Sequence, residues 1–395
     1  MRLSGLSPWW RLVDGIRGHA RGACALLLAS ATLVVMAWGC GASYPLPTEH
    51  RELRVVAGAG TYQMITTKRG LTGISDILLT PSGELFLLFK NPSTVLKYPP
   101  GLNAPLSTTF SGLQNPAAMG FGANQLFVLD QGDTAAARVT LGEPTVYQSD
   151  CGPISGFSRP IADLSKYWSV HAYQLNGAPV GSFTDTLFLW VNGVAADGAG
   201  RVYVSGTIAY CSVDPFDTRI RTFDSQFRIY RYERGAGASG SVIGDGWRRD
   251  LSYEVAEGTG VGSTKDPRGM LWSSGAGSAL YFADTGNHEV QKFADPASGG
   301  SSFKLAFGGS GEDNIHLSFP VDVSVDGAGY VYVADFGNKR VLRYDPDGGF
   351  VQKVNIEKDA VGDTLETPLA VTADNEQVYV ADPAHAEVVR YRRRK

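Results

Sequence analysis

The residues best suited to chemistry in this sequence are aspartates that recur at one place in a repeated pattern. Asp284, Asp335 and Asp382 each end a run of alternating apolar residues, and an aromatic residue follows nine positions later in all three copies. A carboxylate at this place can bind a cation or a substrate, or it can accept backbone N–H groups and shape a turn. Gly and Asn follow two of these aspartates, which favours the turn-shaping role. We assign that structural role to Asp130, Asp284, Asn287, Asp335, Asn338, Arg340 and Asp382.

Histidines are the next candidates, because they can ligate a metal. Four of them, His171, His288, His316 and His385, fall in segments expected to share one face, so a metal site stays an alternative. No two stand at a ligand spacing such as H-x-x-x-H. No G-x-S-x-G elbow, phosphate-binding loop or dinucleotide fingerprint occurs in a suitable setting. The sequence therefore assigns no catalytic residue, no metal ligand and no cofactor.

The first 39 residues have the pattern of a secretory leader. Residues 1–24 carry four Arg against one Asp, and an uncharged run of 14 residues follows at 25–38. That run is too short for a comfortable membrane span and suits a signal peptide.

The Gly39-Cys40 pair that ends the leader resembles a bacterial lipobox. The resemblance implies that Cys40 is acylated and becomes the first residue of the mature protein, with residues 40–50 as a spacer. Trp38 departs from the small or β-branched residue usual there, so an ordinary cleaved signal or an uncleaved anchor is the alternative. We expect an exported lipoprotein of a bacterial envelope.

Composition excludes several classes of protein. The chain of 395 residues is 43% hydrophobic and contains 48 Gly, which indicates a globular, turn-rich body and excludes global disorder. The formal net charge is −4, and removing the four Arg and one Asp of the leader leaves −7. An acidic mature chain argues against nucleic-acid binding.

A repeat organises residues 51–395. Each copy contains short strands of alternating Val, Tyr, Phe and Leu separated by Asp-Gly, Asn-Gly or Gly-Gly turns. Six four-stranded antiparallel sheets in a ring form a β-propeller, an all-β fold. The predicted blades span approximately residues 73–110, 113–148, 187–243, 267–307, 320–356 and 368–392. The last copy has only three strands, so we expect residues 52–57 to close it as an N-terminal strand.

The last three copies resemble the NHL-repeat family of six-bladed propellers. The match rests on the Val-Tyr-Val-Ala-Asp strands at 331–335 and 378–382, and on the Asp-x-Gly-Asn turns at 284–287 and 335–338. It covers roughly residues 50–395 but is weak in the first three copies, so seven blades or a distorted blade are alternatives. NHL-like lyases and lactonases hold a metal in the axial channel, and no such ligand set maps onto this sequence.

Two long insertions are expected on one face of the ring, at residues 149–186 and 207–227. In a four-stranded blade the second-to-third turn and the link to the next blade lie on the same side. Cys151 lies in one insertion and Cys211 in the other, and we expect them to form a disulfide in an oxidising compartment. Two free thiols are the alternative.

Aromatic residues in and near these insertions indicate a binding surface, because large apolar side chains in long loops often anchor partners. The candidates are Tyr167, Trp168, Tyr173, Trp190, Tyr210, Phe216 and Trp247, together with Arg268. The basic stretch 390–395 is either solvated or contacts anionic lipid or polysaccharide.

These features predict an envelope scaffold that binds a protein or polysaccharide partner through its long-loop face. The alternative is a metal-assisted lyase or lactone hydrolase that works in the channel. Three or more His, Asp or Glu side chains converging near the axis would favour the enzyme.

Overall fold

The computed structural model of the protein divides the chain into two units, residues 1–52 and 53–395. It describes residues 60–106, 110–132, 148–149, 168–185, 187–213, 221–235, 240, 242–260, 262–275, 278–294, 302–354 and 364–394. Among these residues none forms a helix long and apolar enough to cross a bilayer. The leader, Cys40 and the spacer lie outside the described residues, so acylation of Cys40 stays a prediction.

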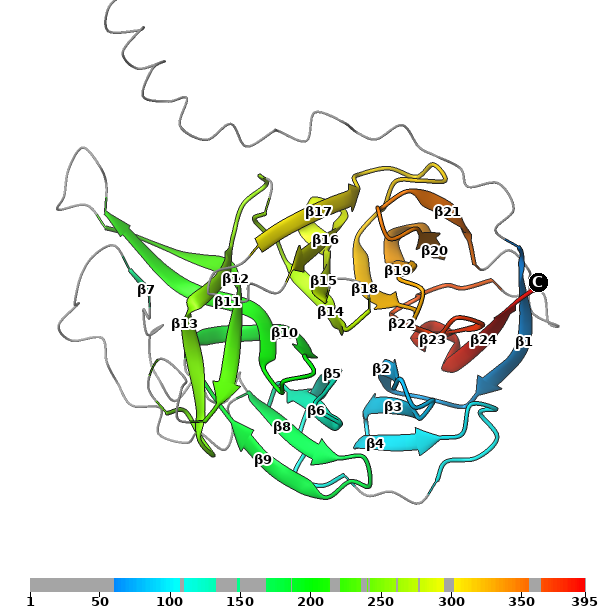
Figure 1. Ribbon diagram of the computed structural model, residues 1–395, viewed down its shortest axis with the longest axis horizontal. Coiled ribbons are helices and arrows are strands. Elements are labelled where there is room, and N and C mark those ends of the chain that lie inside the picture. Colours follow the sequence, from blue (N-terminus) through cyan, green and yellow to red (C-terminus); the bar gives the residue numbers. More distant parts are fainter. Residues whose placement is uncertain are drawn as a thin grey trace, which may run out of the picture. The chain divides into compact units, whose positions relative to one another are not determined.

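Six sheets of antiparallel strands surround a common axis, which is the predicted six-bladed β-propeller (Figure 1). In each blade the strands are given from the innermost to the outermost. Blade 1 contains β2 (Ile74–Leu79), β3 (Leu85–Lys90) and β4 (Ser93–Tyr98). Blade 2 contains β5 (Pro116–Gly122), β6 (Gln125–Asp130), β8 (Ser169–Gln174) and β9 (Pro179–Phe183). Blade 3 contains β10 (Phe188–Ala196), β11 (Val202–Val213), β12 (Arg221–Arg234) and β13 (Trp247–Ala256).

The last three blades have four strands each and follow the repeat closely. Blade 4 contains β14 (Pro267–Ser273), β15 (Ala279–Asp284), β16 (Glu289–Ala294) and β17 (Ser302–Gly308). Blade 5 contains β18 (Pro320–Val325), β19 (Val331–Asp335), β20 (Arg340–Tyr344) and β21 (Phe350–Lys353). Blade 6 contains β22 (Ala370–Ala373), β23 (Gln377–Asp382), β24 (Glu387–Arg393) and β1 (Tyr62–Arg69). Short 3-10 turns occupy Thr285–Asn287, Phe336–Asn338 and Pro383–His385, between the second and third strands.

The second strand of each blade is its most deeply buried part. All residues of β15 and β19 are buried, because both faces of a blade pack on neighbouring blades. One such cluster joins Tyr281 of blade 4 to Val333 and Leu342 of blade 5. This packing explains why Val, Tyr and Phe dominate these strands, since branched and aromatic side chains fill a pleated, two-sided interface.

The ring is closed by an N-terminal strand, as predicted, but by a different segment. β1 pairs antiparallel with β24, with Lys68 opposite Val388 and Met64 opposite Tyr391. The other edge of β24 is paired with β23, so residues 52–57 cannot take the predicted place beside Val388–Tyr391. The closing strand is therefore Tyr62–Arg69. Residues 52–57 lie outside the described residues, which begin at Gly60.

Blades 2 and 3 also differ from their predicted limits. The third and fourth strands of blade 2 are β8 and β9, which lie within residues 149–186, the segment predicted to be a loop insertion. The segment predicted as the fourth strand of blade 2 ends in β7 (Gln148–Ser149), which pairs parallel with β11 of blade 3. The fourth strand of blade 3 is β13, beyond the predicted 241–243. The insertion in blade 3 is an extension of the β11–β12 hairpin, which projects past the ring in Figure 1.

The predicted fourth strands of blades 4 and 5 are confirmed by β17 and β21. In blade 1, residues 107–109 lie outside the described residues, and Leu106 forms an isolated bridge with Lys97.

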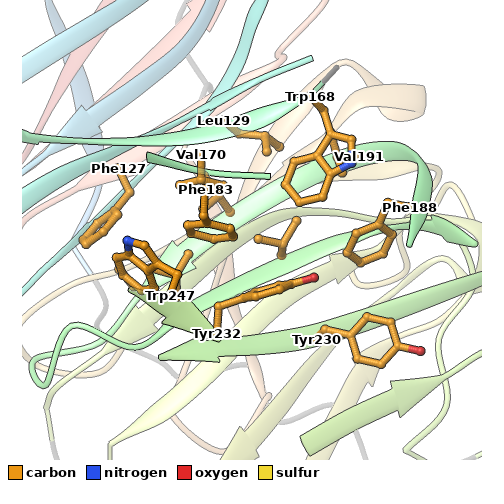
Figure 2. Packing of buried hydrophobic residues seen from close by; sticks show 14 of the residues in the cluster. Phe127, Leu129, Trp168, Val170, Phe183, Phe188, Val191, Tyr230, Tyr232 and Trp247 are labelled. Atoms are coloured by element: carbon orange, nitrogen blue, oxygen red, sulfur yellow. The ribbon is translucent and has the colours of Figure 1, made fainter. Parts of the chain in front are cut away.

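An aromatic core between blades 2 and 3 contains two residues that we had expected in a binding loop. Trp168 and Trp247 have exposed fractions of 0% and 3%. Trp168 packs edge-on against Phe183 and Phe188, and Trp247 packs against Phe183 (Figure 2). Tyr173 is likewise buried. These side chains stabilise the blade interface and are not available to a partner.

Candidate functional site

The six innermost strands surround a cavity of about 910 Å³ on the axis of the ring. Its lining includes residues from the first strand of every blade, among them Asp76, Met119, Trp190, Arg268 and Asp322. A volume of this size falls in the range of about 300–1,000 Å³ that is usual for small-ligand sites. Because every blade contributes to its wall, the cavity is the natural candidate site of this molecule.

Two carboxylates, Asp76 and Asp322, lie in the wall of the cavity at equivalent places in blades 1 and 5. Each follows an irregularity in the pairing of the innermost strand, between Ile74 and Asp76 and between Pro320 and Asp322. Such a bulge turns a side chain out of the regular alternation of the strand. The same place holds smaller residues in the other blades, namely Ala118, Gly193, Gly269 and Ala370.

Both carboxylates are held by backbone N–H groups and bridge neighbouring blades. Asp76 accepts hydrogen bonds from Ile77 N at 2.7 Å and from Met119 N of blade 2 at 2.6 Å. Asp322 accepts one from Val371 N of blade 6 at 2.7 Å. Gly269 packs so closely that a Cβ there would lie 2.1 Å from Asp322 Oδ1. The positions of the two carboxyl groups are therefore fixed by the ring itself.

The two carboxylates repel each other in a poorly solvated place. Burial raises the pKa of Asp76 to about 7. Burial, and then the charge of Asp76, raise the pKa of Asp322 well above its ordinary value. Neither forms an ion pair with any cation among the described residues. Near neutral pH the pair therefore holds a proton, so one carboxyl can donate a hydrogen bond while the other accepts one.

The long-loop face forms one mouth of the cavity, and it carries an aromatic and several polar side chains. The innermost strands begin on this face, as the pairing of Pro267 with Asp284 at the end of the second strand requires. The Trp190 side chain is 40% exposed there. Asn192 Nδ2 donates to Asp266 Oδ1 at 3.0 Å, and Arg268 Nε donates to Asp266 Oδ2 at 3.1 Å. Asp266 thus orients an amide and a guanidinium beside Trp190.

Exposed aromatic side chains gather on this same face. Among the described residues the exposed aromatic side chains are Trp190, Phe319 and Phe336, at 40%, 53% and 38%. Phe319 and Phe336 precede the first strand of blade 5 and follow its second strand, so both lie at the long-loop face. Phe319 has a φ of +48°, an unusual left-handed conformation for a bulky residue, and its ring packs edge-on against His288 at 4.6 Å.

The repeated aspartates lie away from the cavity and organise the long-loop face. Asp130 Oδ1 accepts from Asn115 N and Gly132 N, both at 2.8 Å. Asp335 accepts from Ser318 N, from Asn338 Nδ2 and from Arg340 Nε. Asp284 binds Lys265 N and Asn287 Nδ2 in the same way. Asp382 binds Glu366 N and Thr367. The oxygens of these four carboxylates accept hydrogen bonds that hold the loops and turns of this face in place.

The four histidines do not converge on one point. His171 pairs with Ser169, His316 with Asp313, and His288 accepts from Phe319 N. His385 lies with Asp382 and Glu387 in a group whose potential ligand atoms fall within 4.8 Å of one another. Glu387 is already paired with Arg69 at 2.9 Å, and Asp382 accepts three hydrogen bonds from residues 366 and 367. This group is therefore an internal ion-pair network of blade 6.

Other residues predicted for binding are only partly described. Arg268 lines the cavity and is exposed, as a binding residue should be. Tyr210 and Cys211 lie in β11, where Gln148 and Ser149 pair with them, but their side chains lie outside what the structure describes. Tyr167, Phe216 and Cys151 also lie outside the described residues, so the Cys151–Cys211 disulfide stays a prediction.

Comparisons with known proteins support the fold alone. No family model and no curated protein matches the sequence. A structure of a Bacteroides thetaiotaomicron protein of unknown function is similar with a TM-score of 0.50 and 14% identity, covering 84% of this chain and 72% of that one. The PQQ-bound aldose sugar dehydrogenase of Streptomyces coelicolor is similar with a TM-score of 0.48 and 10% identity, covering 84% of this chain and 98% of that one. A Xanthomonas campestris gluconolactonase is similar with a TM-score of 0.48 and 13% identity, covering 86% of this chain and 97% of that one.

Proposed function

We propose that this protein is an exported, lipid-anchored propeller of NHL type that binds the end of a glycan in its axial cavity, from the long-loop face. The observation that carries the proposal is the half-exposed Trp190 beside a polar cavity of about 910 Å³. An aromatic ring with a few fixed polar groups is the usual composition of a small-ligand site. Its flat apolar face suits the C–H face of a sugar ring.

The polar groups of the cavity suit hydroxyl groups. Asp76 and Asp322 supply carboxyl oxygens on the wall, and Asn192 and Arg268 supply N–H donors at the mouth. Hydroxyls both donate and accept, so a polyhydroxylated ligand can satisfy both kinds of group. Because these side chains are held by the backbone of neighbouring blades or by Asp266, they lose little freedom when a ligand binds.

The glycan proposal is tested by binding of a panel of soluble oligosaccharides to the exported chain, measured by isothermal titration calorimetry. We expect Trp190→Ala to weaken binding of the best ligand by about 2 kcal/mol, which is the loss of binding free energy usual at a hot-spot residue. Leu251→Ala, which removes an apolar side chain that is 66% exposed on β13 at the outer edge of blade 3, is the matched control and should bind normally. Equal affinity of the Trp190 variant would refute the site.

Anchoring is a separate part of the proposal and has its own test. Cys40→Ala should release the protein from membranes washed at high salt into the soluble exported fraction, because the hydrophobic anchor is lost. Retention of the Cys40→Ala chain on membranes after a high-salt wash would count against acylation. Neither outcome affects the glycan site.

A lyase or lactone hydrolase remains the second candidate, and the carboxylate pair is the observation that favours it. Two buried carboxyl groups of which at least one stays protonated near neutral pH are suited to general acid–base work. A zinc ion does not fit the donors present. The described cavity lining contains no His, and Asp76 already accepts a backbone N–H on each oxygen. Conversion of a bound oligosaccharide or lactone that Asp322→Asn abolishes would support the enzyme over a pure binder.

A further inference from the structure

A basic rim lies on blade 6, on the side of the ring opposite the cavity mouth described above. β24 runs from the long-loop face toward the opposite face, where the turn between β22 and β23 lies. Arg393 N donates to Glu376 O of that turn at 2.7 Å, which fixes the end of β24 on the opposite face. We define the basic rim as Arg390, Arg392, Arg393 and Arg394.

The backbone of the rim belongs to a sheet and is not a frayed tail. Arg392 pairs with both Gln377 and Gln63, and Arg393 pairs with Tyr62 of the closing strand. Arg394 N donates to Thr61 O at 2.7 Å, and its Nε donates to Gln63 Oε1 at 3.1 Å. Ring closure therefore holds a row of guanidinium groups in place, in contrast to the solvated chain end that a basic sequence alone would suggest.

The rim keeps a positive charge of its own. Arg392 and Arg394 are exposed, and neither Arg392 nor Arg393 has an ion-pair partner among the described residues. The acidic groups on the adjoining turn are Asp374 and Glu376, so four arginines face two carboxylates. Asp374 Oδ1 accepts from the backbone of Glu376 and Gln377, which holds this carboxylate against its own turn.

The described part of the propeller begins beside the rim. The described chain starts at Gly60, whose Cα packs so tightly that a Cβ would lie 2.5 Å from Arg394 O. Cys40 is twenty residues upstream of Gly60. A chain of that length spans at most ~70 Å, so an acyl group on Cys40 tethers the ring without orienting it. A cationic rim at the point of attachment supplies the missing orientation.

We propose that the basic rim docks on an anionic phospholipid surface and turns the long-loop face away from the membrane. The orientation of the ring on the membrane rests on the proposed lipid anchor at Cys40, whereas the contact with phospholipid needs only the rim. Each Arg near an anionic bilayer increases partitioning roughly fivefold, and the attraction falls off within a Debye length. The docked ring would hold the long-loop mouth of the cavity toward a glycan rather than toward the bilayer.

The test uses the full chain with Cys40→Ala, so that failure of acylation does not affect the result. Cosedimentation at low salt compares vesicles of pure phosphatidylcholine with vesicles containing phosphatidylglycerol. We expect several-fold more protein on the phosphatidylglycerol vesicles, with the excess lost at high salt. Arg392→Gln/Arg394→Gln should lower that excess by about tenfold or more.

The matched control removes the same charge from the long-loop face. Lys265 and Lys339 are exposed there, and Lys265→Gln/Lys339→Gln should leave vesicle binding unchanged. A melting curve of the rim variant verifies that closure is intact, since Arg394 contacts the closing strand. Equal losses in both double variants, or equal binding to both vesicles, would overturn the proposal. So would binding to soluble polygalacturonate but not to phosphatidylglycerol, which would assign the rim to an acidic polysaccharide.

Discussion

Arg69 on the closing strand is paired with Glu387 at the start of the last strand, with Nε and Oε2 2.9 Å apart. The Glu387 side chain is only 4% exposed, whereas that of Arg69 is 44% exposed. In blade 5 the corresponding place on the third strand is taken by Arg340, which pairs with Asp335 of its own blade. Blade 6 has Glu387 there instead, and the cation comes from the N-terminal strand. The ion pair therefore ties ring closure to the turn network of the last blade.

Removing this cation should destabilise the closed ring. We expect Arg69→Met to lower the free energy of unfolding by about 1–3 kcal/mol, because a buried carboxylate loses its partner. Burial raises the pKa of Glu387 and Arg69 opposes that effect, so the loss should grow as the pH rises from 5 to 8. Urea unfolding at both pH values measures it. Arg69→Met/Glu387→Gln should recover most of the loss, and a double variant as unstable as the single one would contradict the pairing.

The third strand of blade 4 carries an acid that favours the folded state only at low pH. Burial, and then the charge of Asp284, raise the pKa of Glu289 to about 7 from an ordinary value near 4.5. A raised carboxyl pKa contributes stability below the unfolded value, and this contribution is lost as the pH rises toward the folded value. The difference in free energy of unfolding between Glu289→Gln and the native chain should therefore shift in favour of the variant by on the order of 1–2 kcal/mol when the pH rises from 4.5 to 8.

This difference is measured by urea unfolding at the two pH values. The variant keeps an oxygen to accept the hydrogen bond from Gln291 Nε2, so the change isolates the charge. The exposed Glu312 provides the control, and Glu312→Gln should show no such pH-dependent gain. A pH-independent effect of Glu289→Gln would show that packing rather than titration is responsible.

The first strands of blades 2 and 3 approach too closely for a side chain at Gly122. A Cβ there would lie 2.3 Å from Asp197 O and 2.6 Å from Ala196 C, both backbone atoms that cannot swing away. We expect Gly122→Ala to cost about 1–3 kcal/mol in thermal unfolding experiments. Gly198 lies in the adjoining turn and has no atom within 4 Å of an added Cβ, so Gly198→Ala should be neutral. Equal effects of the two substitutions would refute the close approach.

The two long insertions meet in the backbone close to the predicted disulfide, which stays a prediction. Ser149 is paired with Cys211, two residues before Cys151 in the sequence. We expect peptide mapping of the exported protein without reductant to recover Cys151 and Cys211 in one linked fragment. Cys211→Ser should cost about 2–4 kcal/mol under oxidising conditions and nothing under reducing ones. Recovery of both residues as free thiols would exclude the linkage.

The repeat pattern was sufficient for blades 4 and 5, because their strands are two-sided and buried. It failed for the outer strands of blades 3 and 6, because an outer strand has one solvent-facing side and needs few apolar residues. The closing strand 62–69 reads YQMITTKR, with a weaker apolar pattern than residues 52–57. It failed again in blade 2, where the long insertion separates β6 from β8. Trp168 lies within the predicted insertion and directly precedes β8, so its position in the sequence suggested a loop although its side chain is buried in a core.

The cavity was harder to predict than the ring, since its wall combines single residues from six distant strands. One signal was present, because Asp76 and Asp322 stand where the other blades have Ala or Gly. A charged side chain at a place otherwise reserved for small residues indicates a role other than packing. Blades 1 and 5 flank blade 6 in the ring, and nothing in the local sequence reveals that these two carboxyl groups interact electrostatically.

The electrostatic contact between Asp76 and Asp322 can be measured directly. Carbon-13 NMR of the carboxyl groups should find the pKa of Asp76 near 7 and that of Asp322 well above its ordinary value, and Asp76→Asn should lower the pKa of Asp322 by removing a neighbouring negative charge. The pKa of Asp322 should stay above 3.8, because burial is the larger cause and persists in the variant. The asparagine at position 76 keeps an oxygen that can accept from Met119 N, so the bridge to blade 2 is kept. Asp266→Asn at the mouth is the control and should leave the pKa of Asp322 unchanged. An Asp322 pKa that does not respond to Asp76→Asn would mean that the two groups titrate independently, which would refute the carboxyl pair invoked for the cavity.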